Sequence, residues 1–317
     1  MRISSSQTYV LGSNAINRQQ TNLFGLQQQL STMKRVNTPS DDPVAASRIV
    51  ETRQTDNRNT QFISNTQAAD ASLALGEVSL GNFADILTEL KTLAVAGGNG
   101  AYSDAELAKL GGEAKAKFEQ LVSLANSVDG QGNYLFSGTK STTTPYVIQG
   151  DGSVQYDGND GQTELQISTS RRIAITDSGS STFGGTSSAF SATTLNSSDG
   201  VFQAVQNLVG VLEAGRAGMA AGGGDYSAML KDTMAGLDQG ITKVVASQAA
   251  LGSRMNETEA LRNNGEDLGL VYKKTISDLE DLDYPKAASD LLFSKSALEA
   301  SQMTFSKVMD MSLFKYI

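Results

Sequence analysis

Four carboxylates lie close together near the middle of the chain, and their type makes them the first candidates for chemistry. They are Asp151, Asp157, Asp160 and Glu164. A pair of carboxylates at a fixed separation can hydrolyse a glycosidic bond. All four, however, lie in or beside glycine-rich turns, which hold side chains less rigidly than helices or strands do. An enzyme built on this region is therefore an alternative function, and we expect no catalytic residues.

The run Asp157-Gly158-Asn159-Asp160-Gly161 has the composition of a calcium loop. An EF-hand loop starting at Asp157 would need an acidic twelfth residue, where this chain has Ser168. The chain also has no His and no Cys, which removes the commonest zinc ligands and the Ser-His-Asp and Cys-His catalytic centres. We therefore predict a turn at residues 157–161, with no metal site and no cofactor.

Charge and hydropathy exclude further classes of function. The formal net charge is −9 over 317 residues, so we expect no nucleic-acid partner bound through a globally basic surface. No apolar run is long enough to span a bilayer, and the N-terminal segment lacks the pattern of a secretory signal peptide. We expect no membrane partner.

Residues 30–49 separate two helical patterns. Two prolines, Pro39 and Pro43, lie within this segment, and a proline disfavours the helical conformation in the residue before it. Asp42 therefore suits an N-cap, with Pro43 as the first residue of the next helix. Asp41 and Asp42 also lie at the positive end of that helix's dipole. We predict an extended linker in which this acidic pair caps a helix and binds no metal.

Both ends of the chain carry a narrow apolar stripe with coiled-coil spacing. Such a stripe buries little surface, so each terminal helix should be marginal without a partner. We expect these stripes to form an assembly interface. Its residues are Ile16, Leu23, Leu26, Leu30 and Met33 near the N-terminus, and Leu291, Leu298, Phe305, Val308 and Leu313 near the C-terminus.

A first long helix is predicted to begin at Pro43. Apolar residues at alternating spacings of four and three run from Ala69 to Ala94, which indicates packing against another helix. Gly76 lies in this seam, where it weakens the helix but permits close approach. We expect the helix to end in the glycines of residues 97–100. A capping box at residues 103–106 then opens a second helix.

The C-terminal half mirrors this arrangement. A short helix over about residues 200–214 precedes a glycine break at 222–224, and a second long helix follows. Tyr284 and Pro285 should break that helix. The simplest way to bury all the stripes is to pair the N- and C-terminal segments antiparallel.

Residues 130–198 are rich in Gly, Ser, Thr and Asp and contain short alternating runs. These alternations, separated by turns at 150–152 and 157–161, are typical of short strands. The alternating pairs are Val154 with Tyr156, Leu165 with Ile167, and Ile173 with Ile175. We predict a small antiparallel β unit at the far tip of the helices.

The predicted fold class is mainly α with a small inserted β domain, on a long antiparallel helical rod made from the N- and C-terminal segments. The predicted domains are a terminal coiled-coil domain (1–42 and 284–317), a helical rod domain (43–129 and 199–283) and the β domain (130–198). Two joints should let the terminal helices tilt relative to the rod. Their residues are Asn37, Pro39, Asp41, Asp42 and Pro43, and Asp283, Tyr284 and Pro285.

Several segments resemble the bacterial flagellin superfamily. LSTMKRVNTPSDDPVAASRI (30–49) is similar to the joint after the first helix of those proteins, with Met33 where glycine is usual and Pro43 where alanine is usual. ISDLEDLDYPKAASDLL (276–292) is similar to their C-terminal signature. MRISSSQTY, GNYLFSGTKSTTTPY and MSLFKYI resemble the superfamily's hook–filament junction proteins and not flagellin.

The resemblance implies a structural, non-enzymatic protein of the bacterial flagellum, extracellular and exported unfolded by the flagellar type III apparatus. It implies an adaptor at the hook–filament junction. The implied partners are hook-associated protein 1, flagellin, further copies of the chain in a ring, and a flagellar export chaperone that holds the C-terminal region. The main alternative is a filament-forming flagellin. An innate-immune ligand is another, because residues 87–99 resemble the receptor-facing flagellin helix, with Lys91 where arginine is expected.

Overall fold

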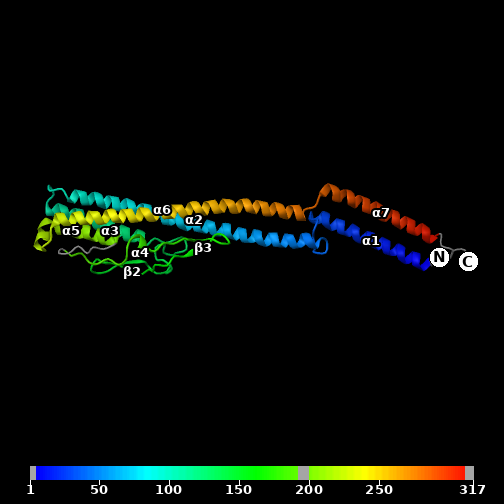
Figure 1. The fold of residues 1–317 in the computed structure, drawn as a ribbon, viewed down its shortest axis with the longest axis horizontal. Coiled ribbons are helices and arrows are strands. Elements are labelled where there is room, and N and C mark those ends of the chain that lie inside the picture. The colour runs from blue at the N-terminus through cyan, green and yellow to red at the C-terminus, as the bar shows by residue number, and fades with distance from the viewer. Residues whose placement is uncertain (1–4, 192–199, 311–317) are drawn as a thin grey trace. The chain divides into compact units, whose positions relative to one another are not determined.

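The computed structural model describes residues 5–191 and 200–310 (Figure 1). Its elements are α1 (Ser5–Thr32), α2 (Pro43–Gly97), α3 (Asp104–Ala125), β1 (Tyr146–Ile148), β2 (Val154–Tyr156), β3 (Glu164–Gln166), β4 (Arg172–Ala174), α4 (Gly179–Thr182), α5 (Val201–Ala221), α6 (Tyr226–Glu280) and α7 (Tyr284–Asp310). A mainly helical chain with a small inserted β region is confirmed.

The chain divides into two compact units. Residues 1–60 with 267–317 form one, named here the terminal unit, and residues 61–266 form the other, the central unit. The long helices α2 and α6 contribute residues to both. The three domains proposed from the sequence have different boundaries and stay a prediction.

In the terminal unit α1 and α7 run antiparallel. The side-chain amide of Gln19 donates to both the carbonyl oxygen and the hydroxyl of Ser294, at 3.3 Å each. Farther along the pair, the rings of Tyr9 and Phe305 lie 5.6 Å apart, centre to centre. N- and C-terminal segments therefore pair as predicted.

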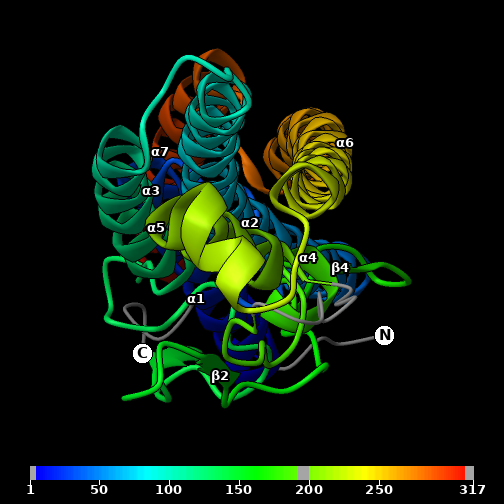
Figure 2. The same ribbon diagram turned by 90° about the vertical axis from the view of Figure 1, so that its left-hand side faces the viewer.

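In the central unit the apolar seam of α2 forms much of the core. The fully buried residues of this seam are Leu73, Leu80, Phe83, Leu87, Leu90 and Ala94, among helices that lie side by side in Figure 2. At Gly76 an added Cβ would lie 3.2 Å from Leu251 of α6. The predicted close approach at this glycine is confirmed.

An aromatic cluster joins the helices of the central unit to its β region. The rings of Phe83 and Phe183 lie 4.3 Å apart, and those of Tyr146 and Phe202 lie 4.7 Å apart. Phe136 packs edge-on against Phe183 at 4.9 Å. Because these rings come from segments spread over residues 83–202, their burial holds the inserted region against the helices.

The β region forms two separate antiparallel hairpins, β1 with β2 and β3 with β4, instead of one unit. A turn containing Gly152, with φ +85°, closes the first hairpin. The predicted turn at 157–161 leads out of it, and the N–H of Asn159 donates to the carbonyl of Ser137 at 3.2 Å. This bond ties the turn to a loop, so no continuous sheet forms.

The expected position of the β region at the far tip is wrong. Ile167 and Ile173 are buried in a cluster with Ala69 of α2. The guanidinium of Arg171 donates to both carboxylate oxygens of Glu257 on α6, at 2.5 and 2.9 Å. The second hairpin thus lies alongside the long helices, because two strands alone cannot bury their apolar face.

Linkers 98–103 and 222–225 form the end of the central unit instead. The hydroxyl of Tyr226 donates to the carbonyl of Gly97 at 2.9 Å. Helix α5 is interrupted at Gly215, with φ +63°, directly after the predicted end of the short helix at residue 214.

The starts of α3 and α7 lie at or near their predicted positions. Before α3, the N–H and hydroxyl of Ser103 both donate to the carboxylate of Glu106 at 2.8 Å. The break expected at Tyr284 and Pro285 lies slightly earlier, since α7 begins at Tyr284. Pro285 stands in the first turn of α7, where no intrahelical N–H bond is required.

Candidate functional site

Asp151 and Asp160, two of the carboxylates singled out by type, accept hydrogen bonds from serines. Asp151 accepts from the N–H and hydroxyl of Ser153, at 2.9 and 2.6 Å, and Asp160 accepts from Ser178 and Ser180. Within residues 5–191 and 200–310, no three side chains of metal-binding type gather closely enough to hold an ion. The Asp151 carboxylate shapes its own turn, whereas that of Asp160 binds serines 18 and 20 positions away along the chain.

All of the predicted interface residues except Met33 and Leu313 lie within α1 or α7, whose contact pairs the two ends of the chain. Most of them are half-buried there: Ile16, Leu23, Leu26, Leu30, Leu291, Leu298 and Phe305. Met33 and Val308 are 57% and 45% exposed, and Leu313 lies outside the described residues. Since this contact lies within one chain, the role of the stripes in assembly stays a prediction.

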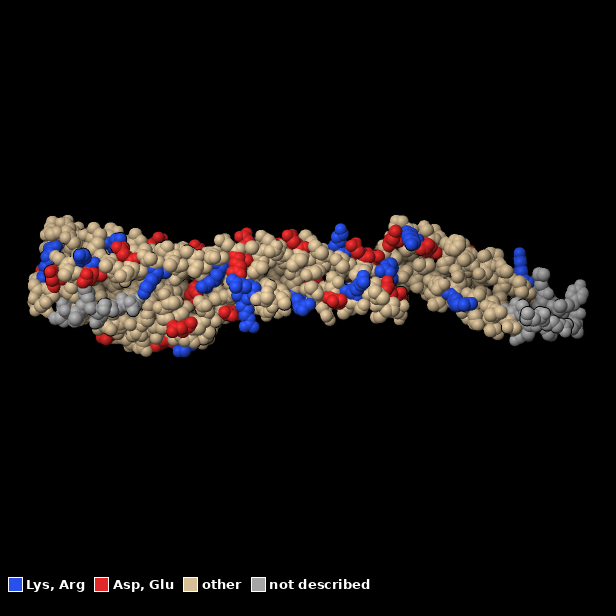
Figure 3. Space-filling view, in the orientation of Figure 1, with Lys and Arg blue, Asp and Glu red and all other residues tan. Residues whose placement is uncertain are grey.

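A second set of apolar side chains on α1 and α7 faces solvent. Phe24 is 71% exposed and Phe293 is 78% exposed. The set, named here the outer apolar surface, comprises Tyr9, Val10, Leu11, Phe24, Leu292, Phe293, Met303, Val308 and Met309. Arg18 is the one charged side chain among the 28 residues of α1. On the face drawn in Figure 3, charged atoms gather over the start of α7 and are sparser farther along the helix pair. These side chains remain available for burial against another chain after α1 and α7 have paired.

Each joint ends in a capping aspartate. The carboxylate of Asp42 accepts from the N–H of Ala45 at 3.0 Å, and that of Asp283 accepts from the N–H of Lys286 at 3.2 Å. The Ala45 bond, helped by the guanidinium of Arg35, holds the pKa of Asp42 below its usual value. Capping of α2 by Asp42 is confirmed.

The first joint contains a closed turn where an extended linker was expected. The carboxylate of Asp41 accepts from the backbone N–H groups of Thr38 and Asn37, at 2.8 and 3.0 Å. These two bonds also lower the pKa of Asp41. The side chain of Asp41 therefore fixes the path of the chain around Pro39.

The two joints are paired with each other. The N–H of Arg35 donates to the carbonyl of Glu280 at 2.6 Å, and the N–H of Leu282 donates to the carbonyl of Met33 at 3.1 Å. Lys34 and Asp281 are partners in an antiparallel bridge. Beside the turn, the linker thus has backbone hydrogen bonds of its own.

A buried carboxylate lies at this pairing. Glu280 is 6% exposed and binds Lys34 at 2.5 Å and Arg53 of α2. Burial alone would raise the pKa of this carboxyl, but the hydrogen bonds from Lys34 and Arg53 outweigh it, and the pKa is lowered. The guanidinium of Arg35 also donates to the carbonyl of Leu279 at 2.7 Å.

A small apolar core lies beside the joints. Val36, Ala45 and Ile49 are buried, and Ile276 and Leu279 of α6 pack against them. A pocket of about 550 Å³ opens beside this core. It is lined by Thr32, Lys34, Val36, Asn37, Thr38, Pro39, Ala46, Ile49, Val50, Arg53 and Glu280.

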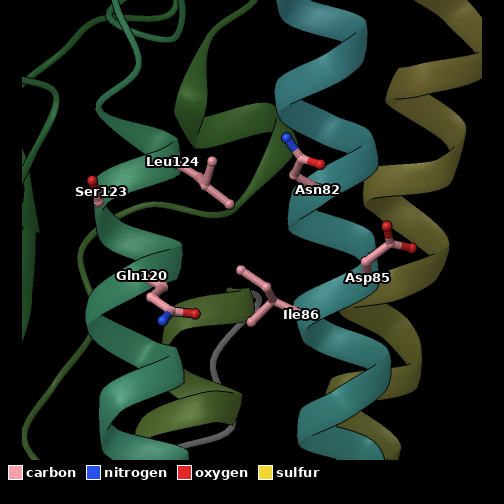
Figure 4. Close-up of a pocket in the computed structure, with 6 residues that line it drawn as sticks. All are labelled: Asn82, Asp85, Ile86, Gln120, Ser123 and Leu124. Carbon is pink, nitrogen blue, oxygen red and sulfur yellow. The ribbon is translucent and has the colours of Figure 1, made fainter.

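The central unit has a groove of about 430 Å³ between α2 and α3. Figure 4 shows its lining residues: Asn82, Asp85 and Ile86 on α2 and Gln120, Ser123 and Leu124 on α3. Elsewhere on α2, Lys91 forms an ion pair with Asp238 of α6 at 2.6 Å. Lys91, where the resemblance to flagellin led us to expect arginine, is thus partnered within the chain.

Comparison with known proteins identifies the family. The N-terminal helical region of bacterial flagellin matches residues 3–141. Flagellar hook-associated protein 3 of Salmonella typhimurium is 31% identical over 317 residues, covering 99% of each chain. The chain belongs to the flagellar hook-associated protein 3 family. The Escherichia coli member is 30% identical over the same span.

Solved structures in the hook-associated protein 3 family share the fold. Hook-associated protein 3 from Legionella pneumophila aligns with a TM-score of 0.63 at 21% identity, over 73% of this chain and 98% of that one. The flagellar junction protein FlgL from the same organism aligns with a TM-score of 0.59 at 20% identity, over 74% and 100%. The resemblance to the flagellin superfamily is confirmed.

Hook-associated protein 3 relatives are structural proteins of the flagellum, and so is this chain, in association with other flagellar components. Among its described residues, no helix has the length and apolarity that crossing a bilayer requires.

Sequence reasoning missed two groups of residues. The outer apolar surface includes Leu292 and Phe293, which directly follow Leu291 of the predicted stripe and could have been found from their apolar type. The contact of Glu280 with Lys34 and Arg53 had no local signal, because its members come from three distant segments.

Proposed function

We propose that this protein is a junction adaptor that joins the flagellar hook to the flagellin filament outside the cell. Its partners are hook-associated protein 1 on the hook side, flagellin on the filament side and further copies of itself in a ring. Full-length similarity to hook-associated protein 3 supports this role, as does a structural neighbour described as a flagellar junction protein. The role is mechanical, without catalysis.

The outer apolar surface is the observation that carries the proposal. Phe24 and Phe293 remain more than two-thirds exposed after α1 and α7 have paired. Burying one such ring contributes about 2 kcal/mol, so neighbouring subunits that cover these side chains gain much of their binding energy there. Because α1 carries one charged side chain, burial of its part of this surface requires little removal of charge from water.

The same terminal helices suit export in an unfolded state. We propose that an export chaperone holds the C-terminal region, with Leu298 and Phe305 as apolar anchors together with Leu313. Leu298 and Phe305, which are half-buried in the folded chain, would then contact the chaperone before folding.

Assembly of the purified chain separates an adaptor from a filament-forming flagellin. We expect no long filaments from the chain alone, and filament growth only when flagellin is added to hooks that carry the chain. In cells lacking it, flagellin should accumulate in the medium while hooks remain bare. Long filaments grown from the purified chain alone would assign it to the filament instead.

A further inference from the structure

The two joints of the terminal unit are connected by backbone hydrogen bonds and by ion pairs. Two backbone hydrogen bonds connect residues 33–35 with residues 280–282. At the same place the carboxylate of Glu280 binds Lys34 of the first joint and Arg53 of α2. One buried side chain at the end of α6 therefore contacts both the joint and the adjoining long helix.

The three charged groups differ in their access to water. The side chains of Lys34 and Arg53 are 45% and 49% exposed, whereas that of Glu280 is 8% exposed. Either cation can be hydrated if the contact opens, but a buried carboxylate that loses its partners is left without solvation. The contact therefore depends most on Glu280.

We propose that Glu280 is a positioning residue that latches the two joints together. With the latch closed, α1 and α7 and the adjoining residues 43–60 and 267–280 form one rigid body, and the tilting predicted from Pro39 and Pro285 does not occur within it. The latch opens when Glu280 loses its charge or its two cations. This property is independent of the partners that the adaptor binds.

Limited trypsin digestion of the full-length chain tests the latch, because trypsin cleaves after Lys34 and Arg35 in the joint itself. It also cleaves after Arg18 on α1 and Lys295 on α7, which serve as reference sites in the same molecule. In the wild type we expect cleavage in the joint to be slower than at the reference sites by roughly tenfold or more. Glu280→Gln should remove that difference.

A matched control is Asp278→Asn, which makes the same change of charge at an exposed position of α6 and should leave the wild-type pattern intact. Hydrogen exchange at the N–H groups of Arg35 and Leu282 provides a second measurement, slow in the wild type and accelerated in Glu280→Gln. If Glu280→Gln fails to fold, Arg53→Gln removes one cation and gives the same comparison. Wild-type cleavage as fast in the joint as after Arg18, or exchange unaltered by both variants, would overturn the latch.

Discussion

The ring of Phe305 packs directly on Gly12, across the contact between α1 and α7. A Cβ built on Gly12 would lie 2.6 Å from two carbon atoms of that ring. Gly25, on the same helix, has no atom within 4 Å of its own Cβ position. The first glycine makes room for an aromatic ring, whereas the second only weakens the helix.

Replacing these two glycines by alanine should therefore stabilise α1 at one position and not at the other. Gly25→Ala should stabilise α1 by about 0.5–1 kcal/mol, because alanine is the better helix former. Gly12→Ala should cancel that gain by displacing Phe305. Hydrogen exchange of α1 amides in the two variants measures both effects, and equal stabilisation by both would show that the ring does not lie on Gly12.

Met33→Gly should stabilise the terminal unit. Met33 has φ 57° and is the one non-glycine residue with positive φ among the described residues, directly after α1 ends at Thr32. An L-residue in this conformation costs roughly 1 kcal/mol more than glycine. Urea denaturation should show the gain, and Met33→Ala, which keeps a Cβ, is the control. A gain of the same size in Met33→Ala would contradict the explanation.

Removing the cap of α2 should weaken the attachment of the filament more than replacing Pro39 does. Asp42→Ala combined with Pro43→Gly removes the bond to Ala45 and the fixed first turn, and should fray the start of α2. We expect cells with this change to secrete the protein but to lose filaments under shear. Pro39→Ala, in the exposed turn, is the milder control. Filament retention after shearing and the amount of secreted protein are measured in the same cultures. Reduced secretion with normal filament retention would contradict this prediction.

Acid should loosen the joints. The pKa values of Asp41, Asp42 and Glu280 lie below their ordinary values of 3.8, 3.8 and 4.5 in the folded chain. The unfolded chain therefore binds protons more readily, so these carboxylates stabilise the fold above those ordinary values and lose that effect as the pH falls through the lowered ones. Circular dichroism during acid titration should show that Glu280→Gln loses less helical signal than the wild type as the pH falls. Identical titration curves for the two proteins would contradict this assignment.

Phe305→Asp should weaken binding of the export chaperone and block assembly. Loss of one buried aromatic anchor costs about 2 kcal/mol, measurable by calorimetry with the purified chaperone. Ser301→Asp is the control, because Ser301 is an exposed residue of α7 that belongs neither to the stripe nor to the outer apolar surface. If Phe305→Asp keeps the wild-type affinity for the chaperone and the cells swim normally, Phe305 is not an anchor.

Local patterns in the sequence predicted the helices well. The seam from Ala69 to Ala94 and the caps at Asp42 and Ser103 depend on residues three or four positions apart, and such spacings are visible without a structure. Gly76 was predicted to admit a neighbour, and Leu251 lies there.

Contacts between distant segments could not be predicted in the same way. The β region was placed at the tip because nothing in its composition indicates Ala69 as a partner. Arg35 and Leu279 are 244 positions apart, and the acidic run around Glu280 gives no sign that this residue alone is buried. Pairing of the joints is set by where the long helices bring them, which no local pattern records.

The bond between Gln19 and Ser294 spans 275 positions, whereas the aromatic cluster is complete within residues 83–202. Closing the longer loop costs more chain entropy, and the terminal helices offer few buried side chains in return. The central unit can therefore fold while the two ends are still apart, and the pairing of α1 with α7 comes last. Under the proposed export of an unfolded chain, the last contact to form is then the one between the two helices that carry the outer apolar surface.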